Sequence, residues 1–132
     1  MNEKSEREST YMLRLTNETR DAFDSFMSRG YFKNKMGQFQ LAVALSLANE
    51  IIPDEVIGEK TAILSVGQAD PNGELLEAVR LLMPKAQLDA LHETRWLERL
   101  AEHGMKIIIK NAEMGGLDFQ MLWNDVKQKR IR

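Results

Sequence analysis

The residue types best suited to metal or acid–base chemistry in this sequence are its two histidines, His92 and His103. Histidine binds transition metals through a ring nitrogen and exchanges protons near neutral pH. On one continuous helix, their separation in sequence places the two rings about 16 Å apart, too far to share a metal ion. The zinc-protease pattern also fails, because Trp96 stands where its second histidine would be. We therefore interpret both histidines as structural.

Nucleophilic and phosphate-binding motifs are equally hard to find. The chain has no cysteine, which excludes thiolate metal sites and cysteine nucleophiles. The glycine-bearing turn 67–73 precedes a predicted helix, but it lacks the Lys-Ser/Thr pair of a phosphate loop and carries acids at Asp70 and Glu74. No Ser-His-Asp arrangement follows from spacing. The sequence thus predicts a protein that is not an enzyme, with no cofactor and no metal.

Two carboxylates, Glu98 and Glu102, lie four residues apart, a spacing that puts both on one face of a helix. Arg95 and Arg99 interleave with them. Opposite charges at this spacing are typical of an exposed helix surface that carries salt bridges. We therefore predict a solvated, salt-bridged face here and no acid–base pair.

Basic residues offer a second kind of chemistry, the binding of phosphate. The chain has 18 Lys and Arg against 20 Asp and Glu, a formal net charge of −2, so a nucleic-acid contact must use a local patch. The basic residues between the two helices and those near the C-terminus also fit solvated surface positions, and cations in the last turn of a helix meet its dipole favourably. The candidate DNA-binding residues are Arg14 on a strand, Arg29, Lys33 and Lys35 between two helices, and Lys127, Lys129 and Arg130 near the C-terminus.

These residues are positioned by elements that follow from the hydrophobic pattern. The segment 39–48 is the most apolar in the chain and is apolar on most sides, which predicts a buried central helix over 35–49 capped by Asn34. Before it, residues 11–15 alternate as a strand does, and residues 18–29 form an amphipathic helix followed by Gly30. Residues 1–10 are polar and are predicted to be a disordered leader.

The second half of the chain is predicted to be mostly helical. After Pro53, a polar loop leads to a strand over 61–66 and the turn at 67–73. Helices are predicted over 74–83 and 85–103, the latter ended by Gly104. The segment 105–110 contains three isoleucines and fits either strand or helix, and we prefer helix. A break at Gly115-Gly116 precedes a last helix, capped by Asp118, that runs to about 129.

Together these elements predict a mainly α fold, with one compact helical domain over 11–132 and two short strands. The order strand, helix, turn, helix at the N-terminus is that of a ribbon-helix-helix unit, in which two chains pair their strands and read the DNA major groove. Met12 and Arg14 would face the groove here. A purely structural strand remains the alternative, and its partner is either 61–66 or a second copy of itself.

The chain also resembles a known family. The run 13–16 (LRLT), the turn 30–33 (GYFK) and the apolar helix 39–47 (FQLAVALSL) are similar to the small accessory proteins of bacterial DNA phosphorothioation (Dnd) systems, including DndE. The strand 61–66, the helix after it and the turn 113–117 (EMGGL) extend the likeness over nearly the whole chain.

The resemblance implies a non-enzymatic accessory or scaffold subunit of an anti-phage defence or DNA-modification complex. Such a subunit would form homo-oligomers, join an ATPase or nuclease partner, and contact DNA. The basic positions that match are Arg14, Arg29, Lys33 and Lys35. A ribbon-helix-helix transcriptional regulator is the alternative hypothesis. No run of eighteen apolar residues and no apolar signal-peptide core occurs, so we expect a cytoplasmic protein with no membrane partner.

Overall fold

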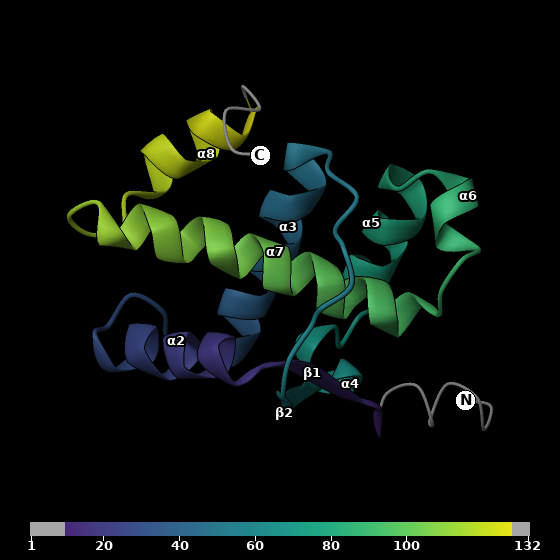
Figure 1. Cartoon of the computed structure of the whole chain (residues 1–132), viewed down its shortest axis with the longest axis horizontal. Coiled ribbons are helices and arrows are strands. Elements are labelled where there is room, and N and C mark those ends of the chain that lie inside the picture. Colours follow the sequence, from purple (N-terminus) through teal and green to yellow (C-terminus); the bar gives the residue numbers. More distant parts are fainter. Residues whose placement is uncertain (1–9, 128–132) are drawn as a thin grey trace.

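Two helices that cross near their centres, α3 (Lys35–Asn49) and α7 (Glu93–Glu113), form the middle of the structure (Figure 1). The computed structural model describes residues 10–127, apart from the side chains of Ala86, Asp125 and Lys127. Its elements, in chain order, are β1 (Met12–Thr16), α2 (Asn17–Ser28), α3 (Lys35–Asn49), β2 (Lys60–Ser65), α4 (Val66–Ala69), α5 (Glu74–Leu82), α6 (Lys85–Leu88), α7 (Glu93–Glu113) and α8 (Phe119–Lys127). The predicted mainly α fold, with an N-terminal strand followed by helices and a second short strand, is confirmed.

The other elements are arranged around this crossing. Helix α2 lies along one side of α7, α8 lies on the other side, and α5 and α6 cover the end of α7 where that helix begins (Figure 1). The core contains side chains from every large element, including Phe23, Phe39, Leu97 and Ile108, all of which are fully or almost fully buried.

The prediction for the central helix is confirmed at both ends. Asn34 caps α3, because its Oδ1 accepts a hydrogen bond of 2.8 Å from the backbone N–H of Gly37. At the other end Glu50 takes a left-handed conformation with φ of 57°. Polar residues inside the helix find partners on its neighbours, since Gln38 Nε2 donates to the carbonyl of Phe23 and Ser46 Oγ donates to that of Leu100.

The two strands pair antiparallel with each other, so β2 is the partner of β1 in this chain. The predicted alternation of β1 is confirmed: Leu13 and Leu15 are buried, and Met12 and Arg14 are exposed. The register shifts between Leu13 and Arg14, which marks an irregularity in the ladder. The ribbon-helix-helix order of elements is therefore present, with the strand paired inside one chain.

The single helix predicted over 85–103 is wrong. Helix α6 ends at Leu88, and His92 has an extended backbone and caps α7 by accepting a bond from the N–H of Thr94 at Nδ1. A side-chain cap of this kind satisfies an N–H at the start of a helix, so a new helix begins at Glu93. The turn predicted at 67–73 is also partly helical, because Ser65 and Gln68 form a capping box that starts the short α4.

The prediction that Gly104 ends a helix is wrong. Gly104 lies inside α7, at the crossing with α3. A Cβ atom at this position would stand 1.9 Å from the carbonyl oxygen of Ala42. Glycine is therefore needed there for close approach of the two backbones and not as a helix breaker. The helix preferred over 105–110 is confirmed as part of α7.

The remaining predictions for the C-terminal part are confirmed where the structure describes them. Gly115 and Gly116 have φ of 114° and 119° and end α7, and Asp118 Oδ1 accepts a bond of 3.0 Å from the N–H of Met121 at the start of α8. Residues 1–9 of the predicted leader and residues 128–129 of the predicted last helix lie outside the described residues. Within 10–127, no helix has the length and apolarity needed to cross a membrane.

Replacing Gly104 with alanine tests the crossing of α3 and α7. The added methyl group overlaps the backbone of Ala42, so we expect Gly104→Ala to lower the free energy of unfolding by about 1 to 3 kcal/mol. Gly37→Ala is the matched control, because its new Cβ makes only ordinary contact and alanine favours the helix. Urea denaturation measures both. Equal stabilities of the two variants would contradict the close approach.

Candidate functional site

The side chains of Glu98 and Glu102 point inward, to the edge of β1 that faces away from β2. Oε2 of Glu98 accepts a hydrogen bond of 2.6 Å from the N–H of Arg14, and Oε2 of Glu102 accepts one of 3.3 Å from the N–H of Thr16. The two glutamates are only 8 % and 4 % exposed. The predicted salt-bridged solvent face is therefore wrong, because the unpaired N–H groups of β1 need acceptors and these carboxylates supply them.

Glu102 also fastens the start of α2. Its Oε1 lies 2.7 Å from the hydroxyl oxygens of both Thr16 and Thr19, and each hydroxyl can donate to it. Thr16 is the N-cap of α2, where its own Oγ1 accepts a bond from the N–H of Thr19. A carboxylate next to a helix N-terminus is favoured by the helix dipole, so the charge of Glu102 stabilises the junction between β1 and α2.

Glu98 has a raised pKa. Burial of the carboxylate is the main cause, since burial disfavours the charged form. The bond from the N–H of Arg14 and the nearby charges of Arg95, Lys60 and Arg14 act in the opposite direction and offset part of the rise. The cost of burying the charged carboxylate of Glu98 is thus partly offset by this hydrogen bond and these cations.

Because the glutamates turn inward, the outward face of α7 is basic. Arg95, Arg99, His103, Lys106 and Lys110 follow each other at intervals of four, four, three and four residues. At 100° per residue these positions fall within a sector of about 80° and extend over about 22 Å. We call these five residues the basic stripe. Arg95, Lys106 and Lys110 are exposed, and Arg99 and His103 are half-buried.

The cations of the basic stripe are available for an external anion. Within residues 10–127, no ion pair joins Arg95, Arg99, Lys106 or Lys110 to a carboxylate. The guanidinium carbon of Arg99 lies 5.3 Å from the centre of the Trp96 ring, which orients this side chain along the helix surface.

His103 lies in the middle of the stripe, and its ring contacts a polar side chain of α3. Its Nε2 is 3.3 Å from Nδ2 of Asn49 on α3. Burial, helped by the charge of Lys106, lowers the pKa of His103, which keeps the ring neutral at neutral pH. Four permanent cations therefore remain in the stripe, with a neutral imidazole between them.

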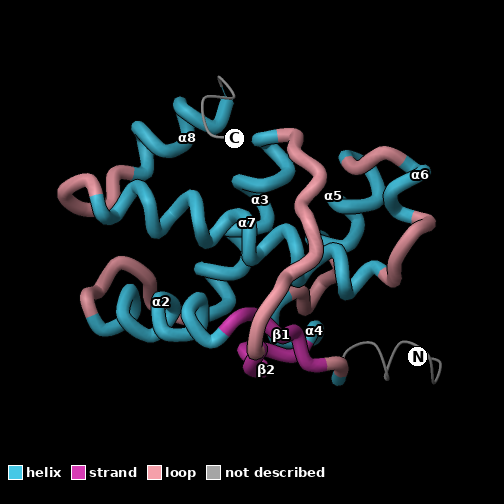
Figure 2. The backbone as a smooth tube through the Cα atoms, in the orientation of Figure 1, coloured by secondary structure: helices cyan, strands magenta, loops and turns pink. Residues whose placement is uncertain are grey.

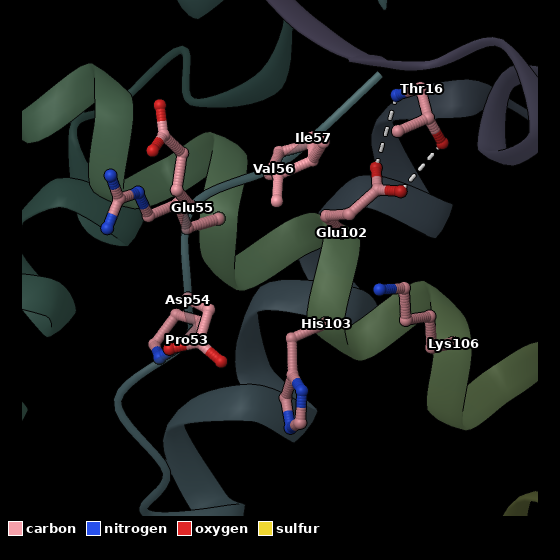
Figure 3. Close-up of a pocket in the computed structure, with 10 residues that line it drawn as sticks. Thr16, Pro53, Asp54, Glu55, Val56, Ile57, Glu102, His103 and Lys106 are labelled. Atoms are coloured by element: carbon pink, nitrogen blue, oxygen red, sulfur yellow. Dashed lines mark hydrogen bonds between the residues drawn. The ribbon is translucent and has the colours of Figure 1, made fainter.

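A pocket of about 350 Å³ lies beside the stripe, between α7 and the connection from α3 to β2 (Figure 3). Arg99, His103 and Lys106 line its helical wall. Figure 3 shows Thr16 and Glu102 joined by hydrogen bonds at one end, with His103 following Glu102 and Lys106 on the next turn of the helix. The opposite wall is formed by residues 53–57, including the carboxylates of Asp54 and Glu55.

The structure does not gather the predicted DNA-binding residues into one patch. Arg14 is exposed on β1, whereas Arg29 and Lys33 lie in the connection between α2 and α3 and Lys35 is the first residue of α3. Arg14 and Arg29 lie beyond opposite ends of α2, a helix about 18 Å long.

Within the α2–α3 group, Arg29 donates to the hydroxyl of Tyr31 and its guanidinium lies 4.8 Å from the centre of that ring. The side chain of Lys127 is not described, and Lys129 and Arg130 lie outside the described residues. The prediction that these positions bind DNA remains a prediction.

The basic stripe was not found from the sequence because the predicted helix ended at Gly104, in the middle of α7. Its spacing is visible only when 93–113 is taken as one helix, and a helix ended at Gly104 separates Arg99 from Lys106. The glutamates also concealed it, since Glu98 and Glu102 look like neutralising partners until β1 is placed beside them.

No match to this chain is found among models of protein families, curated proteins or solved structures. The resemblance to Dnd accessory proteins therefore stays a prediction. Within the described residues, no group of three histidine or acidic side chains could hold a metal ion. The basic stripe and the pocket beside it are the arrangement from which we argue function.

The raised pKa of Glu98 predicts a pH-dependent contribution to stability. Folding favours the protonated form, so this contribution is complete below the ordinary pKa of 4.5 and is lost as pH rises through the folded pKa. Glu98→Gln keeps an oxygen for the N–H of Arg14 but cannot titrate. We expect its free energy of unfolding, relative to the native chain, to increase between pH 4 and pH 7 in urea denaturation.

Glu98→Leu is the comparison variant, because it removes the charge and the acceptor together. An unsatisfied buried N–H costs about 1 to 3 kcal/mol, so this variant should be less stable than Glu98→Gln at every pH. A stability difference between Glu98→Gln and the native chain that stays constant with pH would contradict the assignment.

Proposed function

We propose that this chain is a non-enzymatic accessory subunit of a bacterial anti-phage defence or DNA-modification complex of the Dnd kind, and that it contacts the DNA backbone through α7. The observation that carries the proposal is the basic stripe, with four permanent cations on one helical face. Side chains of Lys and Arg are the usual phosphate contacts of proteins that bind DNA without reading its sequence.

The local charge fits this role even though the whole chain is slightly acidic. A net charge of −2 gives no general attraction to DNA, so binding depends on one surface that concentrates cations. The stripe is such a surface, because its acidic neighbours Glu98 and Glu102 are buried and already bonded to β1 and α2. A helix that meets phosphates along about 22 Å makes several backbone contacts and few contacts to bases.

A non-enzymatic role is supported by the use of the buried carboxylates. Glu102 lines the pocket and Glu98 lies four residues before it on α7, so the two would be the natural acid and base of an enzyme there. Their oxygens instead accept hydrogen bonds from the backbone of β1 and from the hydroxyls of Thr16 and Thr19. Both side chains thus have a structural use.

Protein partners are supported by two exposed apolar surfaces. Leu81 and Leu82 on α5 are 75 % and 66 % exposed, and Leu82 shares a groove with Ile52. Phe119 and Trp123 on α8 are also substantially exposed. Exposed apolar groups that cluster in this way are typical of protein–protein contact sites, which fits a subunit that joins an ATPase, a nuclease or further copies of itself.

The ribbon-helix-helix alternative is less well supported by this geometry. Such a regulator pairs β1 with β1 of a second chain, but one edge of β1 is paired with β2 and the N–H groups of the other edge donate to Glu98 and Glu102. Pairing two chains would require these bonds to break. The accessory role needs no such rearrangement.

Binding to duplex DNA as a function of salt tests the proposal. We expect the native chain to bind a short duplex and to lose affinity steeply as salt rises. The stripe variant, with Arg95→Gln, Arg99→Gln, Lys106→Gln and Lys110→Gln together, should reduce the slope of log K against log salt by about 3 to 4. Fluorescence anisotropy measures the affinity, and thermal unfolding checks that the variant folds.

A second variant separates the stripe from the positions first predicted. Arg29→Gln, Lys33→Gln and Lys35→Gln together remove three cations from the α2–α3 connection and the first residue of α3, and we expect this variant to keep most of the native affinity. Strong loss of binding in this variant, with little effect in the stripe variant, would place the contact at the α2–α3 connection. A native chain that binds no DNA would overturn the DNA-contacting role.

A further inference from the structure

The connection from α3 to β2 passes across the outward face of α7. Figure 2 shows this loop running from the end of α3, in front of α7, to the start of β2. Its residues 53–57 form the wall of the pocket that faces Arg99, His103 and Lys106. We call residues 51–58 the strap. It covers the middle of the basic stripe.

The strap is fastened at its ends and loosely held between them. Just outside it, the carbonyl of Glu59 accepts a bond of 3.1 Å from the N–H of Asn17, and Glu50 bonds back to Leu47. Within the described part of the chain, no backbone-to-backbone hydrogen bond involves residues 51–58. Segments with few such bonds open at low cost in free energy, so the strap can leave α7 without unfolding the core.

The packing of the strap's side chains also indicates that the strap is weakly held. Pro53 is buried and holds the part next to α3, whereas Ile57 is 87 % exposed and contributes little packing. Gly58 has φ of 113°, a conformation that allows the chain to turn sharply before β2. The weakly packed part is therefore 54–58, directly over the stripe.

The charge of the strap opposes that of the stripe. Asp54 and Glu55 are exposed and line the same pocket as Arg99 and Lys106, but no ion pair forms between the two sides. Charges that face each other across a solvent-filled pocket attract weakly and are screened by salt. A phosphate chain that approaches the stripe meets these carboxylates and is repelled by them.

We propose that the strap is an autoinhibitory cover, whose carboxylates compete with DNA phosphates for the basic stripe and must move aside for full contact. This inference rests on the proposed DNA-contacting function and adds its regulation. Opening exposes Arg99 and His103, which are half-buried in the closed structure, so that the cations of the stripe form one continuous surface. Closing leaves Arg95, Lys106 and Lys110 accessible.

Neutralising the strap tests the inference. We expect Asp54→Asn with Glu55→Gln to tighten binding of a short duplex by about three- to tenfold at low salt, since each exposed charge contributes a modest free energy. The matched control, Asp24→Asn with Glu77→Gln, changes the net charge equally at exposed positions outside the pocket and should have a smaller effect. In the background of the stripe variant, the strap substitutions should have no effect.

The outcomes distinguish this inference from the function on which it rests. If the native chain binds through the stripe but the strap variant and the control variant have equal affinities, the strap is no cover and the proposed function stands. If neither the native chain nor the strap variant binds DNA, the proposed function itself fails. Circular dichroism of each variant confirms that folding is unchanged, which is expected because all four substituted positions are exposed.

Discussion

The backbone N–H groups along the outer edge of β1 impose the constraint on which this structure depends. Glu98 and Glu102 supply their acceptors, and in doing so they fix the rotation of α7 about its own axis. The contact between Gly104 and Ala42 fixes the distance of α7 from α3 in the same way. Because the rotation of α7 and its distance from α3 are both fixed, the face of α7 that carries the basic stripe is turned towards solvent.

The same rotation separates the charges of α7 by face. The acids at positions 98 and 102 accept hydrogen bonds from β1 inside the protein, whereas bases at 95, 99, 106 and 110 lie outside. A helix of mixed sequence charge thereby presents a row of cations to solvent between 95 and 110. The acidic strap crosses this surface, so the proposed phosphate-binding face on α7 and the proposed cover over it line the same pocket.

Local patterns predicted the local features of the fold. Asn34, the alternation of β1 and the apolar pattern of α3 each depend on neighbours in sequence, and these predictions agree with the structure. The errors concern contacts distant in sequence. In the sequence, Glu98 and Glu102 look like partners of Arg95 and Arg99. Their true partner, β1, lies more than 80 residues earlier, and the periodicity of a helix gives no information about such distant contacts. Gly104 looks like a helix end because its close neighbour belongs to α3.

Mapping the proposed DNA contact residue by residue is the most direct test of this account. In NMR spectra of the labelled native chain titrated with a short duplex, the account predicts that the largest changes occur at the amide and side-chain signals of 95–110 in α7 and at the amides of the strap. Signals of 29–35 between α2 and α3 should change little. Changes confined to 29–35, or no changes at a saturating concentration of DNA, would contradict a contact made through the outward face of α7.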